Sequence, residues 1–168
     1  MMHLQYRDAV LEDLPEIVAI YNSTVAGRMV TADTTPVTVE SRLPWFHAHG
    51  PERRPLWMAY DGETLVGWIS FSSFYGRPAY DGTVEVSIYL AENARGKGYG
   101  KAVLQYAIDA APRLSIHTLL GVIFAHNVPS IKLFMDKGFV EWAHLPDIAI
   151  LDGTPRSVKI LGLKVSNP

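Results

Sequence analysis

Near the centre of the chain, the spacing of hydrophobic residues changes from every second position, typical of a strand, to every third or fourth position, typical of a helix. Between residues 83 and 90 apolar and polar side chains alternate, which predicts a β-strand with two unlike faces. The apolar face comprises Val84, Val86, Ile88 and Leu90, and the polar face comprises Glu85, Ser87 and Tyr89. From residue 99 to residue 111 apolar residues recur every three or four positions, as on one side of a helix that Pro112 ends. We therefore expect a strand, a short loop and a helix at the centre of the fold.

Hydrophobic patterns on either side predict the remaining elements. The expected strands are residues 3–7, 56–60, 64–72, 119–124, 140–142 and 158–165. The expected helices are residues 12–22, residues 38–49, and a third helix that begins at Asn127 or Val128 and that Gly138 ends. Asp61-Gly62 is typical of a hairpin turn, and Pro44 predicts a kink or break in the second helix. Residues 23–37 have no period, which indicates a long loop, and a second loop holds Asp152-Gly153. The order βααβββαβαββ predicts one domain, residues 1–168, of the α/β class, with helices layered on a mixed sheet.

The loop before the central helix combines glycines with basic side chains. Its members are Arg95, Gly96, Lys97, Gly98, Tyr99, Gly100 and Lys101. Glycine lets a backbone come close to a ligand, and the first turn of a helix offers unpaired N–H groups to an anion. We therefore expect a phosphate or pyrophosphate to bind here; an ordinary connection with solvated cations is the alternative. The spacing is one residue short of a P-loop, and GxGxG does not match the GxGxxG of dinucleotide-binding proteins.

Four segments resemble the GNAT superfamily of N-acetyltransferases, over residues 3–163. Arg95-x-x-Gly98-x-Gly100 resembles the acyl-CoA pyrophosphate loop, and the central strand, residues 126–130 and residues 133–139 agree in order and spacing. Residues 31–36, 45–46 and 79–85 look like the phosphinothricin N-acetyltransferase branch, which includes enzymes that act on methionine sulfoximine and methionine sulfone. The resemblance implies a mixed, mostly antiparallel central sheet flanked by helices, acetyl-CoA as the acetyl donor, and a homodimer.

The resemblance also implies which residues bind acetyl-CoA. They are Ile88, Tyr89, Leu90, Arg95, Gly96, Lys97, Gly98, Tyr99, Gly100, Lys101, Asn127 and Asp136. The strand backbone would pair with the pantetheine arm, with N–H groups near Ile88 as oxyanion donors, and the glycine-rich loop would hold the pyrophosphate. Asn127 is also suited to capping the helix that follows it, and Asp136 to an exposed helix position.

Acetyl transfer to an amine requires loss of a proton, stabilisation of charge on the thioester oxygen, and departure of a thiolate. Glu85 is our candidate base, since it matches the acidic residue that the family has in this strand. From the pattern alone it is equally a glutamate on a solvated sheet face, because a carboxylate is a weak base unless burial raises its pKa. On the acceptor side Arg77 is predicted to bind a carboxylate, and Tyr75 and Gly76 are included by the family match. A surface position for Arg77 is the alternative.

Two residues depart from the family pattern. Phe134 stands where many members have a tyrosine that is proposed to protonate the leaving thiolate, and where the resembled branch usually has histidine. The acid would then be Tyr89, a water molecule or nothing, since a thiol has a pKa not far above 7 and can leave as the anion. His126 replaces a more usual small or acidic residue, and it is either a second base or an exposed loop histidine.

Composition narrows the class of protein. The 168 residues are 48% hydrophobic and 19% charged, with a formal net charge of −2 and no apolar run near the ~20 residues of a membrane span. The basic residues are scattered, so we expect no nucleic-acid partner. The chain has no cysteine, and His47 and His49 do not share a helix face, so we expect neither disulfides nor a metal site. The first eight residues have no signal-peptide core, and we expect a cytoplasmic protein.

The resemblance to the GNAT superfamily, together with the candidate site residues, implies a function. We expect an acetyl-CoA-dependent N-acetyltransferase that transfers the acetyl group directly to the α-amine of a small amino-acid-like substrate of the phosphinothricin, methionine sulfoximine or methionine sulfone type. The alternatives are the same chemistry on a peptide N-terminus or a polyamine, and an acyl-CoA-binding regulatory module without catalysis. The loop of residues 74–81 offers one carboxylate beside Arg77, which argues against a polyamine site, whereas Phe134 favours the non-catalytic module.

Overall fold

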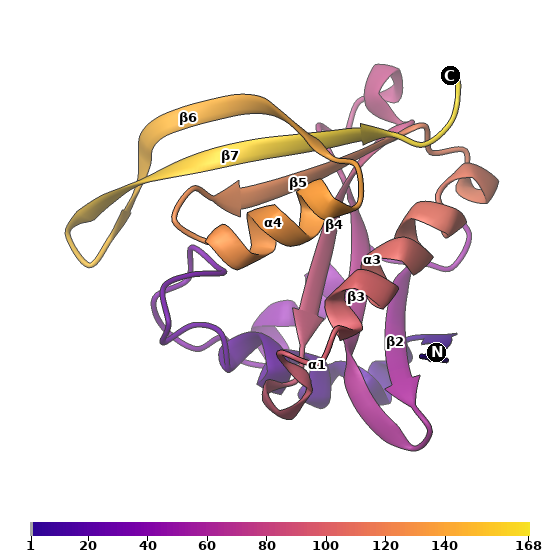
Figure 1. Cartoon of the computed structure of the whole chain (residues 1–168). Helices are drawn as coiled ribbons and strands as arrows, with labels where there is room; N and C mark the ends of the chain where they lie inside the picture. The colour runs from indigo at the N-terminus through magenta and orange to yellow at the C-terminus, as the bar shows by residue number, and fades with distance from the viewer. Residues whose placement is uncertain (1) are drawn as a thin grey trace.

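A computed structural model describes residues 2–168 and contains a seven-stranded sheet (Figure 1). The strands are β1 (Gln5–Asp8), β2 (Leu56–Asp61), β3 (Thr64–Ser73), β4 (Thr83–Leu90), β5 (Thr118–Phe124), β6 (Val140–Leu151) and β7 (Thr154–Lys164). They lie in the order β1-β2-β3-β4-β5-β7-β6, and within the described chain all neighbours are antiparallel except β4 and β5. The predicted mixed, mostly antiparallel sheet is confirmed.

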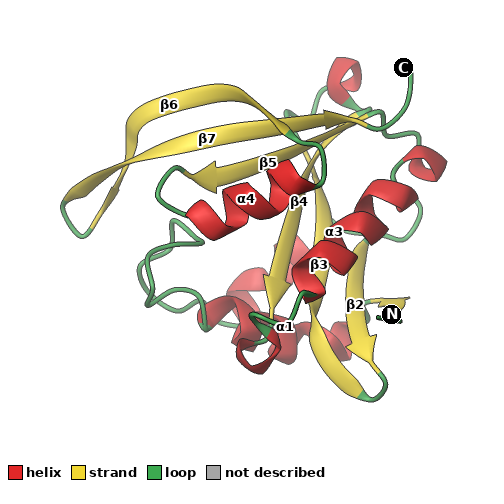
Figure 2. Ribbon diagram, in the orientation of Figure 1, coloured by secondary structure: helices red, strands yellow, loops and turns green. Residues whose placement is uncertain are grey.

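The helices lie on both faces of this sheet (Figure 2). α1 (Leu14–Asn22) and α2 (Leu43–His47) share a hydrophobic cluster with Met58 and Trp68. α3 (Tyr99–Ala110) and α4 (Val128–Asp136) pack on the other face, in a core that includes Val84 and Val86. The apolar face of β4 therefore belongs to the main core, and its polar face is turned toward α1 and α2. The predicted order βααβββαβαββ is confirmed.

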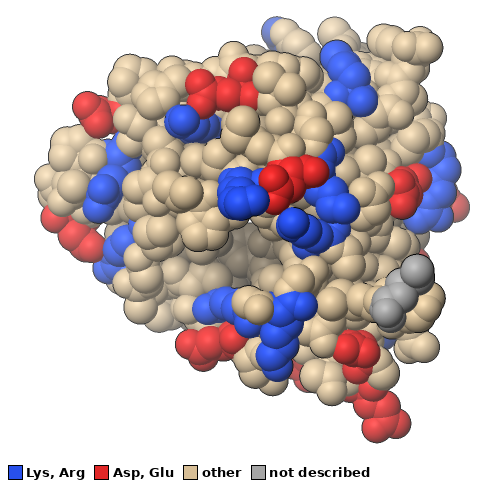
Figure 3. All heavy atoms as spheres, in the orientation of Figure 1, with Lys and Arg blue, Asp and Glu red and all other residues tan. Residues whose placement is uncertain are grey.

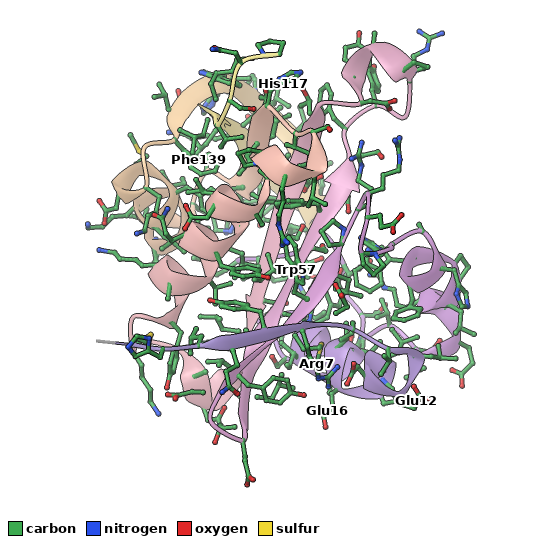
Figure 4. The ribbon with its side chains drawn as sticks, turned by 90° about the vertical axis from the view of Figure 1, so that its right-hand side faces the viewer. Arg7, Glu12, Glu16, Trp57, His117 and Phe139 are labelled. Atoms are coloured by element: carbon green, nitrogen blue, oxygen red, sulfur yellow. The ribbon has the colours of Figure 1, made fainter. Side chains whose placement is uncertain are left out.

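Aromatic side chains hold α3 against the strands at one end of the sheet. Figure 4 shows Trp57 of β2 between the sheet and α3. Its ring contacts Phe71 and Tyr106 edge-on, at centroid distances of 5.2 and 5.1 Å. Tyr106 also stacks on Tyr6 of β1 at 3.7 Å. These contacts fix the position of α3, and with it the glycine-rich loop that precedes the helix.

β4 and β5 pair over three positions and then separate. The register pairs are Thr83 with Thr118, Val84 with Leu119, and Glu85 with Leu120. From Val86 onward β4 keeps β3 as its neighbour, and within the described residues no position of β5 lies opposite it. Figure 1 shows the two strands diverging near α4. The separation opens the sheet at its centre, directly after Glu85.

The last two strands are longer than the sequence predicted. We expected strands at residues 140–142 and 158–165 with a loop between them, but β6 and β7 form a hairpin of 12 and 11 residues around the Asp152-Gly153 turn. The register shifts between Glu141 and Ala143 and again after Leu145, so the two-residue period is lost. β6 is also an edge strand, where Pro146 removes no hydrogen bond of the ladder.

Pro44 interrupts the second predicted helix, as expected. Residues 40–42 form a 3₁₀ turn, and α2 begins at Leu43 with Pro44 in its first turn. The break leaves α2 short, so it covers the sheet with only a few side chains. Among residues 2–168 no helix combines the length and the apolar character needed to span a bilayer.

Candidate active site

A pocket of about 230 Å³ lies on the face of the sheet that α1 and α2 cover. β3 and β4 form its floor, and α1, the residues before α2, and α2 form its walls. The lining residues are Ile17, Val18, Tyr21, Val37, Arg42, Trp45, Trp68, Ser70, Ser72, Glu85, Ser87 and Tyr89. The pocket therefore combines one carboxylate and one guanidinium with serine hydroxyls and aromatic rings.

The polar face of β4 forms the floor together with β3. In the antiparallel register Glu85 is opposite Ser72, Ser87 is opposite Ser70, and Tyr89 is opposite Trp68. Side chains at paired positions project from the same face of a sheet, so these six stand in two adjacent rows. The alternating sequence placed Glu85, Ser87 and Tyr89 on one face, and all three line the pocket.

Burial raises the pKa of the Glu85 carboxyl above its usual range. Among the described residues no Lys, Arg or His forms an ion pair with this carboxylate. Glu85 does not lie on an open, solvated sheet face, because α1 and α2 cover that face. A half-buried carboxylate without a cationic partner is stabilised by a proton or by a bound cation, which suits a residue that accepts a proton from an ammonium group.

Tyr89 is held by aromatic rings on two sides. It stacks on Trp68 at a centroid distance of 4.5 Å, and its ring lies 5.2 Å from that of Tyr21. Burial is the main cause that raises the pKa of the Tyr89 phenol, with the nearby Tyr21 and Glu85 adding to it. The hydroxyl therefore stays protonated at neutral pH and donates a hydrogen bond; because its pKa is raised, it releases a proton less readily than an ordinary phenol.

The sequence analysis missed a hydrogen-bonded group of side chains in the pocket wall. Arg42 lines the pocket, donates to Asp33 over 3.1 Å, and lies above the ring of Tyr21 at 4.7 Å. The Tyr21 hydroxyl donates to Asp33 and shares a hydrogen bond with Thr31. One feature of the sequence could have placed Arg42 beside the pocket. Arg42 precedes Trp45 by three residues, and residues with this spacing share a helix face. The aperiodic loop that holds Asp33 gave no signal of its own.

The glycine-rich loop has the backbone that its composition predicted. Gly96 and Gly98 have positive φ angles of 72° and 85°, a region that favours glycine, and Gly98 is the N-cap of α3. Arg95 donates to the Leu90 carbonyl over 3.3 Å and to the Ser23 hydroxyl over 2.8 Å, so it ties the loop to β4 and α1. Figure 3 shows a hollow in this face of the molecule, with Lys and Arg side chains on both sides of it.

The backbone of β4 turns polar groups toward the opening that β5 leaves. The Ala91 N–H donates to the Val66 carbonyl over 2.8 Å. Because hydrogen-bonded and non-hydrogen-bonded pairs alternate along an antiparallel ladder, the N–H and C=O groups of Ile88 and Leu90 point away from β3. They face the side from which β5 has separated, where an extended ligand can pair with them.

Asn127 and Asp136 lie at the two ends of α4. Asn127 is buried, and its side chain accepts a hydrogen bond from the Ser130 N–H over 3.3 Å, so it caps the helix. Asp136 is held by Lys132 at 2.8 Å and by Lys101 of α3 at 3.3 Å. Both residues thus have structural roles, and Asp136 also connects α4 to the first turn of α3.

The two departures from the family pattern have clear structural positions. Phe134 is buried, with its ring against Gly121 and 4.9 Å from the ring of Phe139, so this position belongs to the core. The Nε2 of His126 donates to the Arg28 carbonyl over 2.9 Å. His126 therefore joins the β5–α4 loop to the long loop after α1, and it does not line the pocket.

Tyr75, Gly76 and Arg77 do not line the pocket of this chain. All three are exposed, and Tyr75 packs on Phe74 and Tyr80 in an aromatic cluster on the surface. The predicted acceptor arginine is therefore outside the pocket, whereas Arg42, which the sequence analysis did not select, lies inside it.

Comparison with known proteins relates the chain to a family of enzymes. Residues 16–139 match the model of the acetyltransferase (GNAT) family. YwnH of Bacillus subtilis (strain 168), provisionally assigned as a phosphinothricin acetyltransferase, is 55% identical over 155 residues, which cover 92% of this chain and 94% of YwnH. An L-methionine sulfoximine/L-methionine sulfone acetyltransferase of Pseudomonas paraeruginosa is 35% identical over 149 residues, which cover 88% of this chain and 86% of that protein.

A solved structure shows the same fold. It is that of a GNAT superfamily phosphinothricin acetyltransferase from Sinorhizobium meliloti in complex with acetyl-CoA, at a TM-score of 0.89 and 28% identity. The similarity covers 99% of this chain and 94% of that one. The family model spans most of the chain, and the relatives match it over nearly their whole length. We conclude that this chain belongs to the GNAT family of acetyltransferases.

Proposed function

We propose that this chain is an acetyl-CoA-dependent N-acetyltransferase for the α-amine of a small amino acid of the phosphinothricin, methionine sulfoximine or methionine sulfone type. The observation that carries the proposal is the position of Glu85, in a covered pocket at the point where β4 leaves β5. The pocket lies on one side of β4, and the opening beside the glycine-rich loop begins at the same residue. An amine in the pocket and a thioester in the opening would therefore meet at Glu85.

The opening beside β4 fits acetyl-CoA, which supplies the thioester carbonyl that an amine attacks. The amide groups of the loop from Gly96 to Lys101 would bind the pyrophosphate, with the basic side chains adding positive charge. The outward backbone groups of Ile88 and Leu90 would pair with the pantetheine arm, and the Ile88 N–H would stabilise negative charge on the carbonyl oxygen. Tyr89, Tyr99, Asn127 and Asp136 are the remaining predicted donor contacts.

Proton transfer requires only a modest contribution from the protein. A peptide α-amine with a pKa near 8 is about one unit from neutrality at pH 7, which costs about 1.4 kcal/mol; the α-amine of a free amino acid is more basic because its carboxylate stabilises the ammonium form, so its deprotonation costs somewhat more. Glu85, with its pKa raised by burial, would accept this proton directly or through a water molecule. The protonated phenol of Tyr89 lines the same pocket and would donate a hydrogen bond to the thiolate, which would leave as the anion because a thiol has a pKa not far above 7.

The size of the pocket favours a single amino acid as the acceptor. Its volume of about 230 Å³ is below the roughly 300–1,000 Å³ that is usual for sites of drug-sized ligands. A peptide acceptor would place only its N-terminal residue beneath α1 and α2.

Thiol release with each of the three amino acids tests the proposal. We expect turnover of at least one of them between about pH 6 and pH 9, and a large loss of turnover in E85Q. Tight binding of acetyl-CoA without any turnover would contradict the proposal and favour a regulatory acyl-CoA-binding module. Because acetyl-CoA is a cytoplasmic metabolite, the proposed reaction is a cytoplasmic one.

We also infer a homodimer. On the face of β5, β6 and β7 opposite α4, apolar side chains lie exposed without a helix over them. They include Val122, Val140 and Trp142, which are 43%, 58% and 48% exposed. The register supports a common face, since Val122 is opposite Ile160, Val140 is opposite Gly162, and Trp142 lies over Gly162. A second copy covering this face would remove the apolar surface from water.

Sedimentation analysis of the wild-type protein and W142E tests the dimer. We expect a wild-type dimer and a monomeric variant, and a wild-type monomer at micromolar concentration would contradict the inference. Tyr75, Gly76 and Arg77 stay predictions as acceptor contacts.

A further inference from the structure

We propose that Arg42 binds the carboxylate of the acceptor amino acid and thereby makes the pocket selective for α-amino acids over amines without a carboxylate. The inference rests on the proposed function, because it concerns the acceptor side of the same pocket. It assigns the recognition of the acceptor to a side chain of this chain's own pocket wall.

The geometry of Arg42 leaves most of its hydrogen-bonding capacity for a ligand. Its side chain lines the pocket and is 27% exposed. Only Nη2 is engaged within residues 2–168, by the Asp33 carboxylate at 3.1 Å. A guanidinium carries five N–H donors in a planar fork that matches a carboxylate, so Nε and Nη1 are available for a second anion.

The surroundings of Arg42 hold the guanidinium in place. It lies above the Tyr21 ring at 4.7 Å, and the Tyr21 hydroxyl donates to the same Asp33 carboxylate that pairs with Arg42. Thr31, which is buried, shares a hydrogen bond with that hydroxyl. A side chain held in this way loses little freedom when it binds a ligand, which favours affinity. Tyr21 and Asp33 are therefore positioning residues for Arg42.

The distribution of charge in the pocket matches a zwitterion. Glu85 is a carboxylate without a cationic partner among the described residues, and it suits the ammonium group of the acceptor. Arg42 is the guanidinium of the same lining and suits the carboxylate. The rings of Trp45, Trp68 and Tyr89 provide an apolar surface for the rest of the molecule. A free amino acid has all three features, whereas a polyamine lacks the carboxylate.

A pair of acceptors that differ by one carboxylate tests the proposal. We would measure kcat/KM for methionine sulfone and for its decarboxylated analogue, 3-(methylsulfonyl)propylamine, in the wild type, R42Q and R42K. In R42Q the ratio of the two kcat/KM values, amino acid over amine, should fall by about 10²-fold, chiefly through KM for the amino acid. R42K should keep part of the ratio. Because both acceptors are measured on the same preparation, a partly folded variant does not change the ratio.

Two comparison variants make the result specific. Arg53 is an exposed arginine that pairs with Asp81 outside the pocket, and R53Q removes the same charge. We expect R53Q to keep the wild-type ratio. An unchanged ratio in R42Q, or a fall in R77Q without one in R42Q, would overturn the proposal.

A different result would show that the proposed function itself is wrong. It would appear as a wild-type protein that acetylates neither compound. Equilibrium binding of methionine sulfone, measured by titration calorimetry in the presence of coenzyme A, then tests Arg42 alone. A Kd that is about 10²-fold higher in R42Q than in the wild type would support the assignment, and equal Kd values would overturn it.

Discussion

Glu85 and Leu120 form the last register pair between β4 and β5. The pair places the half-buried carboxylate of Glu85 where the pairing of β4 with β5 ends. After Glu85, β4 pairs with β3 alone. Val86 and Ile88 continue along β3, and the outward groups of Ile88 face the opening. One strand thus presents a carboxylate on its face and free amide groups at its edge within a few residues.

Replacing Glu85 with Gln should lower kcat/KM by about 10²–10⁴-fold, the usual contribution of a general base. In the wild type, kcat/KM should fall as the pH decreases through the raised pKa of Glu85, because only the ionised carboxylate accepts a proton. E85Q should lose the part of the acidic limb that Glu85 sets and keep only the part that the substrate amine sets. The pH dependence of kcat/KM, at saturating acetyl-CoA, provides the measurement.

His126 provides the matched comparison for that experiment. Its Nε2 donates to the Arg28 carbonyl, and the side chain lies outside the pocket lining. We expect H126Q to keep the acidic limb with a midpoint close to that of the wild type. If H126Q lost the limb and E85Q retained it, the base would be His126 and the present assignment would be wrong.

The substitution E85Q should also stabilise the folded protein at neutral pH. Burial makes the folded-state pKa of Glu85 higher than the unfolded value of about 4.3, so the folded state binds this proton more tightly. The free energy of unfolding therefore decreases as the pH rises from the unfolded pKa through the folded pKa. The amide of E85Q does not ionise, so the Tm difference between variant and wild type should be larger at pH 7 than at pH 4. Scanning calorimetry at both values measures it, and an equal difference at both would exclude ionisation as the cause.

The glycine at the N-cap of α3 should be required for binding of the donor. G98A forces a side chain into a positive φ of 85°, which costs roughly 1–2 kcal/mol and displaces the amide groups of the loop. We expect the Kd for coenzyme A to rise at least tenfold, as measured by calorimetry. Gly62, in the β2–β3 turn, has a φ of 61° and equally open surroundings, so G62A tests strain alone. Equal effects of the two variants on Kd would argue against the loop as the pyrophosphate site.

The close approach of Gly121 to Phe134 should make this part of the core intolerant of added volume. A Cβ at position 121 would lie 2.6 Å from the Phe134 ring, and both residues are buried. G121A should therefore lower the free energy of unfolding by about 1–3 kcal/mol. F134L in the same background should recover part of the loss, because it shortens the side chain that clashes. Urea unfolding of the double-mutant cycle measures the coupling, and strict additivity would contradict the contact.

Much of the framework could be predicted from the sequence because its signals are local. The alternation of residues 83–90, the glycines before α3 and the proline at position 44 each act through the backbone of a few residues. The order of helices and strands, the positive φ angles of Gly96 and Gly98, and the shared face of Glu85 and Tyr89 follow from them. The β6–β7 hairpin was underestimated because its register shifts remove the two-residue period that the prediction needed.

By itself, then, the sequence determined the central strand, loop and helix and the family to which they belong. Only the tertiary structure decided which side chains share the pocket. Arg42, Asp33 and Tyr21 come from a 3₁₀ turn, an aperiodic loop and a helix, and no period along the chain connects them. The burial that raises the pKa of Glu85 is likewise a consequence of α1 and α2 packing over the sheet. The charge state and the exposure of a side chain depend on the groups that surround it in space. Those groups come from segments far apart in the sequence, so they are determined only when the chain packs.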